Sequence, residues 1–193
     1  MVAKLAQKMT QYFIKKKVIK EEEKDTYDYC FEVLVATVIN LVILVVLGIL
    51  TKRYIETALF CTLFMFLRGA AGGYHANTHA GCLLTLLIVY GILLSTLLIN
   101  IRILFYVSIL LFAIAIIIFI ILAPVDNKNK ILEITEKKRL KKRLVLILSI
   151  ITVIFTALMF FKSSYIYAYT ISYIMFSVAI LVLLGNIKNI IGR

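Results

Sequence analysis

The sequence predicts an all-α polytopic membrane protein with about six transmembrane or partly re-entrant helices and an N-terminal amphipathic interfacial helix. Three observations support this fold class. Apolar residues make up 63% of the 193 residues, and the mean hydropathy is +1.02, more than a soluble core uses. Long apolar segments recur along the chain, and the Lys and Arg residues stand in short runs between them. Because such runs are typical of membrane proteins, the net charge of +12 does not indicate a nucleic-acid partner, and the length suits a single integral membrane domain over residues 1–193.

Residues 1–29 form the predicted amphipathic interfacial segment. Leu5, Met9 and Tyr12 recur with helical spacing, and lysines crowd the same stretch. A basic amphipathic helix of this kind is expected to lie in the headgroup plane against anionic lipid. A solvated helix is the alternative.

The first three membrane segments are predicted over residues 33–51, 54–71 and 82–101. Residues 33–51 carry no charge, and at about 1.5 Å per residue they are long enough to cross the hydrocarbon. In 54–71 the charge-free stretch between Glu56 and Arg68 is short. This segment therefore either spans with Arg68 reaching to the interface or enters and returns on the same side.

Three further membrane segments are predicted over residues 103–125, 144–161 and 163–187. Pro124 ends the first of them, because proline does not continue a helix interior. Residues 126–143 carry eight basic and three acidic side chains and are predicted to be a basic cytoplasmic loop.

The charge distribution predicts that both termini are cytoplasmic. If six segments cross, one side receives seven lysines from residues 1–24, Arg68, eight basic residues from 126–143 and two from 188–193. The excess of basic residues marks the cytoplasmic side, which places residues 68–82 at the cytoplasmic boundary. The basic residues of the other side number four: Lys52, Arg53, Arg102 and Lys162.

Residues 68–82, RGAAGGYHANTHAGC, form the predicted active-site segment. They place one arginine, four glycines, two histidines and a cysteine between two apolar segments. Polar groups at membrane depth are costly and usually mark function. A histidine beside Cys82 could take the thiol proton, and the thiolate could then attack a carbonyl carbon.

Spacing alone leaves both histidines open as the base. On a straight helix His75 and Cys82 would share a face but lie about 10.5 Å apart along the axis, too far for a hydrogen bond. If His75 is the base, the segment must therefore bend, and Gly72, Gly73 and Gly81, with Asn77, are the residue types expected where a backbone bends. His79 and Cys82 are an i,i+3 pair, which a helix brings together directly.

Other interpretations of this segment and of the chain remain open. His75, His79 and Cys82 could bind zinc, but no H-E-x-x-H pattern is present, so we expect neither a metal nor another cofactor. The glycines could serve only close helix packing. For the whole chain, a small membrane transporter or peptide exporter and a non-catalytic membrane scaffold are the alternative functions, although no internal repeat typical of transporters is evident.

Two segments resemble a known family. The run RGAAGGYHA of residues 68–76, followed by Cys82, is similar to the signature of the accessory gene regulator B (AgrB) family. The run APVDNK of residues 123–128 resembles a second segment of that family. With the basic N-terminal helix and the number of apolar segments, the resemblance covers essentially the whole chain.

The resemblance implies a function and roles for particular residues. The family consists of membrane-embedded cysteine endopeptidases of bacterial quorum sensing, located in the plasma membrane. They cleave a small amphipathic propeptide toward its C-terminal side, hold the N-terminal part as a thioester, and promote its cyclisation to a thiolactone or lactone. On the matched positions, Cys82 would be the nucleophile and His75 the base, and Arg68 and Gly73 would be necessary. The family also suggests a homodimer.

Some site residues rest on weaker grounds. Gly72 and Tyr74 lie within the run that resembles the signature and are supporting residues, and His79 lies outside the pattern, so its role stays open. Besides membrane lipid, we expect the propeptide to be bound through its acidic tail by basic residues of 1–24 or 126–143, and six basic side chains of the second region are the candidates for a test. These are Lys137, Lys138, Arg139, Lys141, Lys142 and Arg143.

Overall fold

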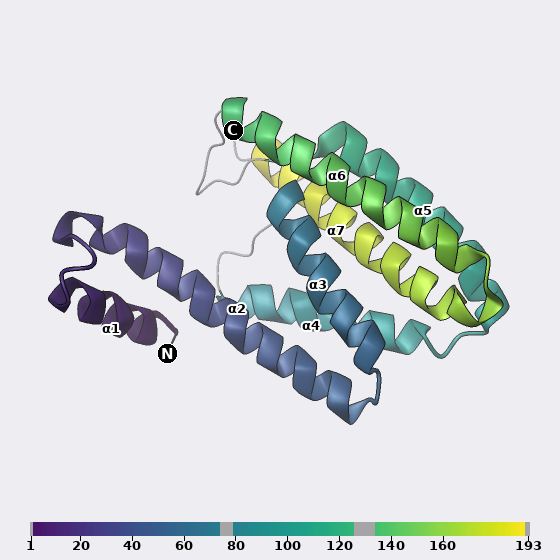
Figure 1. The fold of residues 1–193 in the computed structure, drawn as a ribbon, viewed down its shortest axis with the longest axis horizontal. Coiled ribbons are helices and arrows are strands. Elements are labelled where there is room, and N and C mark those ends of the chain that lie inside the picture. The colour runs from purple at the N-terminus through teal and green to yellow at the C-terminus, as the bar shows by residue number, and fades with distance from the viewer. Residues whose placement is uncertain (1, 74–78, 126–133, 192–193) are drawn as a thin grey trace. The chain divides into compact units, whose positions relative to one another are not determined.

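The computed structural model describes residues 2–73, 79–125 and 134–191, and every regular element in this part of the chain is a helix. The chain is an all-α polytopic membrane protein, which confirms the predicted fold class. Its helices cluster into two compact units (Figure 1). The first ends at Lys52, and the second begins at Arg53.

The first unit contains α1 (Val2–Lys15), the short 3-10 helix η1 (Glu21–Glu23) and α2 (Lys24–Leu50), and α1 folds back on α2. Small residues of α1 are buried in this unit, namely Ala6 and Thr10, and small side chains let two helices approach closely. The Phe13 ring stacks on that of Phe31, with centroids 5.5 Å apart. The lysines of α1 remain exposed, so this helix has one packed face and one basic face.

The second unit is built around one central helix. Its elements are α3 (Tyr54–Ala71), α4 (His79–Thr96), α5 (Ile101–Leu122), α6 (Ile134–Met159), η2 (Lys162–Ser164) and α7 (Tyr165–Ile191). Helix α7 contacts α3, α5 and α6 and is mostly buried, whereas the other long apolar helices are mostly exposed (Figure 1). The exposed apolar faces of the outer helices suit contact with lipid. The core of the unit lies along α7.

Buried polar side chains of α7 are satisfied within the helix. Thr170 donates to the Ile166 carbonyl at 2.9 Å, and Ser177 donates to the Tyr173 carbonyl at 2.8 Å. A polar group in hydrocarbon has no water as a partner, so it needs one from the protein. The hydroxyls of α7 therefore do not weaken the core in which they lie.

Five helices of the described part are long and apolar enough to cross a membrane. They lie in Glu21–Leu50, Tyr54–Ala71, Arg102–Leu122, Thr135–Met159 and Lys162–Ile190. Helix α4 has 18 residues, as α3 does, and its described apolar part, Gly81–Thr96, is shorter than these five.

One of these helices extends beyond its apolar part. Residues 134–143, which the sequence predicts to lie in a basic loop, form the first turns of α6 and continue into the apolar turns without a break. Alternating charged side chains do not oppose a helix when they are Lys, Arg and Glu, because these residues have high helix propensity.

The two ends of the second unit differ in their exposed side chains. Aromatic residues are exposed where α3 and α5 begin and where α6 ends, at Tyr54, Tyr106, Phe160 and Phe161. Such residues gather at membrane–water interfaces. The opposite end carries the basic first turns of α6 and the segment that follows Arg68 (Figure 1).

Candidate active site

The helical path is interrupted by glycines directly after α3. Gly72 has φ +70° and Gly73 has φ +108°, backbone conformations that side chains with a Cβ rarely adopt. The Gly72 N–H still donates to the Arg68 carbonyl at 3.1 Å, so the interruption begins as α3 closes. The predicted bend therefore occurs at this glycine pair, whereas Gly81 lies inside α4.

The interruption is held by the segment that follows α5. The Val125 N–H donates to the Ala71 carbonyl at 3.0 Å, and Gly72 and Val125 form an isolated parallel β-bridge. The two segments that the sequence relates to the same family, 68–82 and 123–128, are thus joined by their backbones. Asp126, Asn127 and Lys128 lie outside the described residues.

Both glycines lie where backbones approach closely. A Cβ on Gly72 would collide with the Val125 carbonyl oxygen, and a Cβ on Gly73 would lie 2.8 Å from the Leu181 carbonyl oxygen and 2.9 Å from the Val182 Cα. Because these neighbours are backbone atoms, they cannot move aside as a side chain could. The end of α3, the segment after α5 and the later turns of α7 therefore meet at the glycine pair.

Arg68 lies in the last turn of α3 and faces the interruption. Its Nη1 donates to the Gly72 carbonyl at 3.2 Å. The guanidinium also lies close enough to Cys82 to interact with it electrostatically. Arg68 and Cys82, which are fourteen positions apart on different helices, are therefore within range of an electrostatic interaction.

Cys82 lies near the start of α4, and its side chain is partly buried. Leu86, Tyr90 and Leu93 follow it at helical spacing and are buried, so Cys82 belongs to the side of α4 that faces the bundle. The other two cysteines are elsewhere, because Cys30 is exposed on α2 and Cys61 is partly buried on α3.

The histidines are only partly described. His79 begins α4, so its backbone stands one helical turn before that of Cys82, but its side chain lies outside the description. Tyr74 and His75 also lie outside the described residues. Among the residues that are described, no three His, Cys, Asp or Glu side chains are grouped as metal ligands would be.

The basic residues predicted to bind the substrate tail are all on α6. Lys138, Arg139 and Lys142 are exposed, and Lys137 is partly buried. They occupy the first turns of the helix, at the end of the second unit where α3 stops and α4 starts (Figure 1). Lys141 and Arg143 are exposed beside them.

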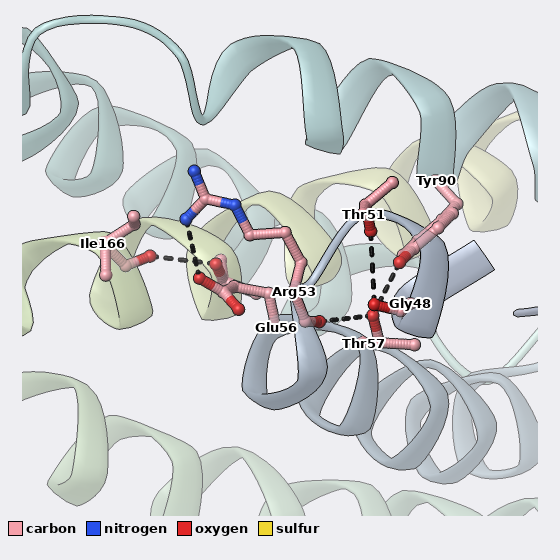
Figure 2. A network of polar contacts seen from close by, with 8 residues as sticks. Gly48, Thr51, Arg53, Glu56, Thr57, Tyr90 and Ile166 are labelled. Atoms are coloured by element: carbon pink, nitrogen blue, oxygen red, sulfur yellow. Dashed lines mark hydrogen bonds and ion pairs between the residues drawn. The ribbon is translucent and has the colours of Figure 1, made fainter. Parts of the chain in front are cut away.

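A polar network at the start of α3 was not expected from the sequence. Arg53 Nη1 pairs with Glu56 Oε1 at 3.2 Å, and the Thr57 hydroxyl lies 2.6 Å from that of Tyr90 on α4 (Figure 2). Glu56, Thr57 and Tyr90 are all buried. A buried ionisable residue in an apolar helix, here Glu56, is a signal that the sequence offers, but the bond from Thr57 to Tyr90 of α4 is visible only in the structure.

Comparisons with known proteins agree with the resemblance of the two segments. The family model described as accessory gene regulator B (AgrB) matches residues 6–184. Two relatives from Clostridium perfringens, strains SM101 and 13, have names that describe them as AgrB-like, and each is 29% identical over 136 residues. These matches cover 67% of this chain and 64% of each relative, so the chain spans less than two thirds of their length. No solved structure matches.

Proposed function

The chain belongs to the accessory gene regulator B family, and from this premise we propose that it is a membrane-embedded cysteine endopeptidase that processes a small propeptide. Membership of the family supports a role in the accessory gene regulator system. The finer proposal is cleavage toward the C-terminal side of an amphipathic autoinducer propeptide, followed by cyclisation to a thiolactone or lactone.

The observation that carries the proposal is the position of Cys82. The glycine pair after α3 allows the chain to leave one helix and begin another, so that Arg68 and Cys82 come within electrostatic reach. A positive guanidinium attracts a thiolate sulfur, which is the form of cysteine that attacks carbonyl carbon. The bond between Val125 and Ala71 holds this arrangement from a second segment.

The proposed reaction has two acyl transfers. A histidine takes the thiol proton as Cys82 Sγ attacks the scissile carbonyl, the C–N bond breaks, and the histidine returns the proton to the leaving amine. The N-terminal part of the peptide is left as a thioester on Cys82. A thiol or hydroxyl of the same peptide then attacks the thioester carbonyl, gives up its proton, and releases Cys82 as a thiol together with a cyclic product.

Cyclisation requires that water does not reach the thioester first. The site lies at the end of a bundle whose outer faces are apolar, so we expect little water near it. An active site that excludes water suppresses hydrolysis of reactive intermediates. A nucleophile within the bound peptide has the further advantage of proximity, which is worth a high effective concentration.

A mass measurement tests the nucleophile. Incubation of the purified full-length protein in lipid nanodiscs with a candidate propeptide is expected to give a thioester adduct on the Cys82 tryptic peptide. Cys82→Ala should remove both adduct and cleavage. Cys61→Ala is the matched control, because Cys61 is also a partly buried cysteine on a helix of the second unit, and it should retain both. Cleavage by Cys82→Ala would exclude the mechanism.

A second measurement assigns the base. We propose His75, because it occupies the matched family position, although His79 stands one turn from Cys82 on α4. His75→Ala should lower kcat by at least about a hundredfold, the contribution typical of a general base, and His79→Ala should lower it much less. The opposite ranking would make His79 the base.

A further inference from the structure

The sulfur of Cys82 is carried on a helix whose rotation decides where it points. Cys82, Leu86, Tyr90 and Leu93 recur along one side of α4, and the last three are buried against the bundle. Arg68, by contrast, is carried by α3. The distance between guanidinium and sulfur therefore depends on how α4 is set against α3.

Two tyrosine hydroxyls join the middle of α4 to α3 and to α7. The Tyr90 hydroxyl lies 2.6 Å from Thr57 Oγ1 of α3 (Figure 2). Tyr173 of α7 donates to the Val89 carbonyl at 2.9 Å. Tyr90 is 1% exposed and Thr57 is 5% exposed. The neighbouring residues Val89 and Tyr90 of α4 are thus bonded to two different helices.

The bond between α3 and α4 has a defined direction. Thr57 has one hydroxyl hydrogen, and this hydroxyl donates to the Arg53 carbonyl at 2.6 Å. Tyr90 is therefore the donor to Thr57. The Phe60 ring of α3 lies 5.2 Å from the Tyr90 ring, centroid to centroid, so the tyrosine is held by its ring as well as by its hydroxyl.

These bonds can fix the position of Cys82 because no water competes for them. In hydrocarbon, a hydroxyl that loses its protein partner has no other, so interhelical hydrogen bonds set which parts of two helices face each other. Cys82 precedes Tyr90 by eight positions, about 12 Å along a helix axis. A rotation or shift of α4 at Tyr90 is therefore transmitted to the sulfur.

We propose that Tyr90 and Tyr173 are positioning residues for Cys82. Their hydroxyls set the rotation and height of α4 and thereby hold the sulfur within electrostatic range of the Arg68 guanidinium. They do not touch the reacting atoms. The inference rests on the proposed function, in which Cys82 is the nucleophile.

The test measures the reactivity of Cys82 without any peptide. Full-length protein in nanodiscs, with Cys30→Ser and Cys61→Ser so that Cys82 is the one thiol, is alkylated with iodoacetamide. Tyr90→Phe, Thr57→Val and Tyr173→Phe keep the size of each side chain and remove the bond. Each should slow alkylation by up to about threefold to twentyfold, the factor reached when the whole stability contribution of one interhelical hydrogen bond acts on the position of the sulfur. Arg68→Ala should slow it as well.

Two comparisons separate positioning from general stability. The double variant Tyr90→Phe/Thr57→Val should be no slower than either single variant, because both remove the same bond. Tyr106→Phe, which alters an exposed tyrosine of α5, should leave the rate unchanged. A purely structural role would lower the thermal unfolding midpoint and leave the alkylation rate of Cys82 unchanged.

Unchanged or faster alkylation in well-folded Tyr90→Phe and Thr57→Val would overturn the inference. If Tyr90→Phe does not fold, Thr57→Val still removes the acceptor and decides the question. Failure of the proposed function has a different signature, because the unaltered protein would then form no thioester with a propeptide while its alkylation rates still responded to the tyrosines.

Discussion

Gly72 and Gly73 hold conformations that other residues adopt only at a cost. Both have positive φ, and both have backbone atoms of another segment where a Cβ would stand. The strain of a left-handed backbone is about 1–2 kcal/mol per residue for side chains with a Cβ. The collision with backbone atoms adds to this, because relief requires that α3, α7 or the segment after α5 moves.

Alanine at either glycine is expected to disable the site. Gly73→Ala should displace the end of α3 from Leu181 and Val182 of α7, lower the thermal unfolding midpoint, and reduce cleavage at least about tenfold. Gly91→Ala is the matched control, because a Cβ at Gly91 meets no atom within 4 Å. Its helix should gain stability by about 0.5–1 kcal/mol. Thermal scans and cleavage rates in nanodiscs measure both, and equal behaviour of the two variants would contradict the role of close approach.

At this scale the sequence predicts part of the site. Glycine pairs and a cysteine in an apolar chain are visible as letters, so a bend near Cys82 could be predicted. The residues that contact the glycines could not be predicted. Val125, Leu181 and Val182 contribute only backbone atoms to these contacts, and every residue type has the same backbone, so the sequence does not identify them.

Helix α6 joins a basic stretch and an apolar stretch that the sequence suggests are separate elements. Its first ten residues are strongly basic and the remainder is apolar, which suggests a loop followed by a span. The structure makes them one helix, because Lys, Arg, Glu and Leu all favour helix. The cations therefore stand on the first turns of a helix and not on a loop.

Charge reversal on α6 tests whether this surface binds the acidic tail of a propeptide. Changing Lys138, Arg139, Lys142 and Arg143 to Glu should raise KM at least about tenfold with little change in kcat, since the tail does not take part in the chemistry. Added salt should raise KM for the unaltered protein and much less for the variant, because exposed charges are screened.

The control for this prediction lies at the other end of the bundle. Arg102→Glu and Lys162→Glu place similar changes near the starts of α5 and α7 and should leave KM unchanged. Equal KM values for the α6 variant and the unaltered protein across the salt range would argue against a tail-binding surface.

Other elements follow their sequence patterns more closely. The predicted segment 54–71 coincides with α3, because Arg53 and the glycine pair mark both ends. Helix α4 ends earlier than the predicted segment 82–101. The prediction extends too far because Leu97, Leu98 and Ile99 are apolar and contain no residue type that usually ends a helix. The bond between Tyr90 and Thr57 was equally hidden, because single tyrosines and threonines are ordinary in membrane helices.

At the scale of the whole molecule, the second unit has two unlike ends. Exposed aromatic residues lie at the end where α3 and α5 begin, and the cations of α6 and Arg68 lie at the other end. A membrane protein with this asymmetry is oriented with its basic end toward the cytoplasm. We therefore propose that Cys82 works at the cytoplasmic boundary and that both termini are cytoplasmic.

Labelling of single cysteines tests this orientation. In a Cys30→Ser/Cys61→Ser/Cys82→Ser background, Lys138→Cys should react with a membrane-impermeant maleimide only after intact cells are opened. Lys162→Cys should react in intact cells, because it stands at the opposite end of α6. The reverse pattern would place the site outside the cell.

The joint at Gly72 and Gly73 also connects two helix ends of opposite polarity. A helix carries partial negative charge at its carbonyl end and partial positive charge at its amide end. Arg68 stands in the last turn of α3, and Cys82 stands in the opening turns of α4. The cation therefore faces a negative end, and an anion formed on the sulfur faces a positive one. The two helix ends thus compensate both charges where lipid leaves little water to do so, and in the proposed reaction they would assist the histidine base by stabilising the thiolate of Cys82.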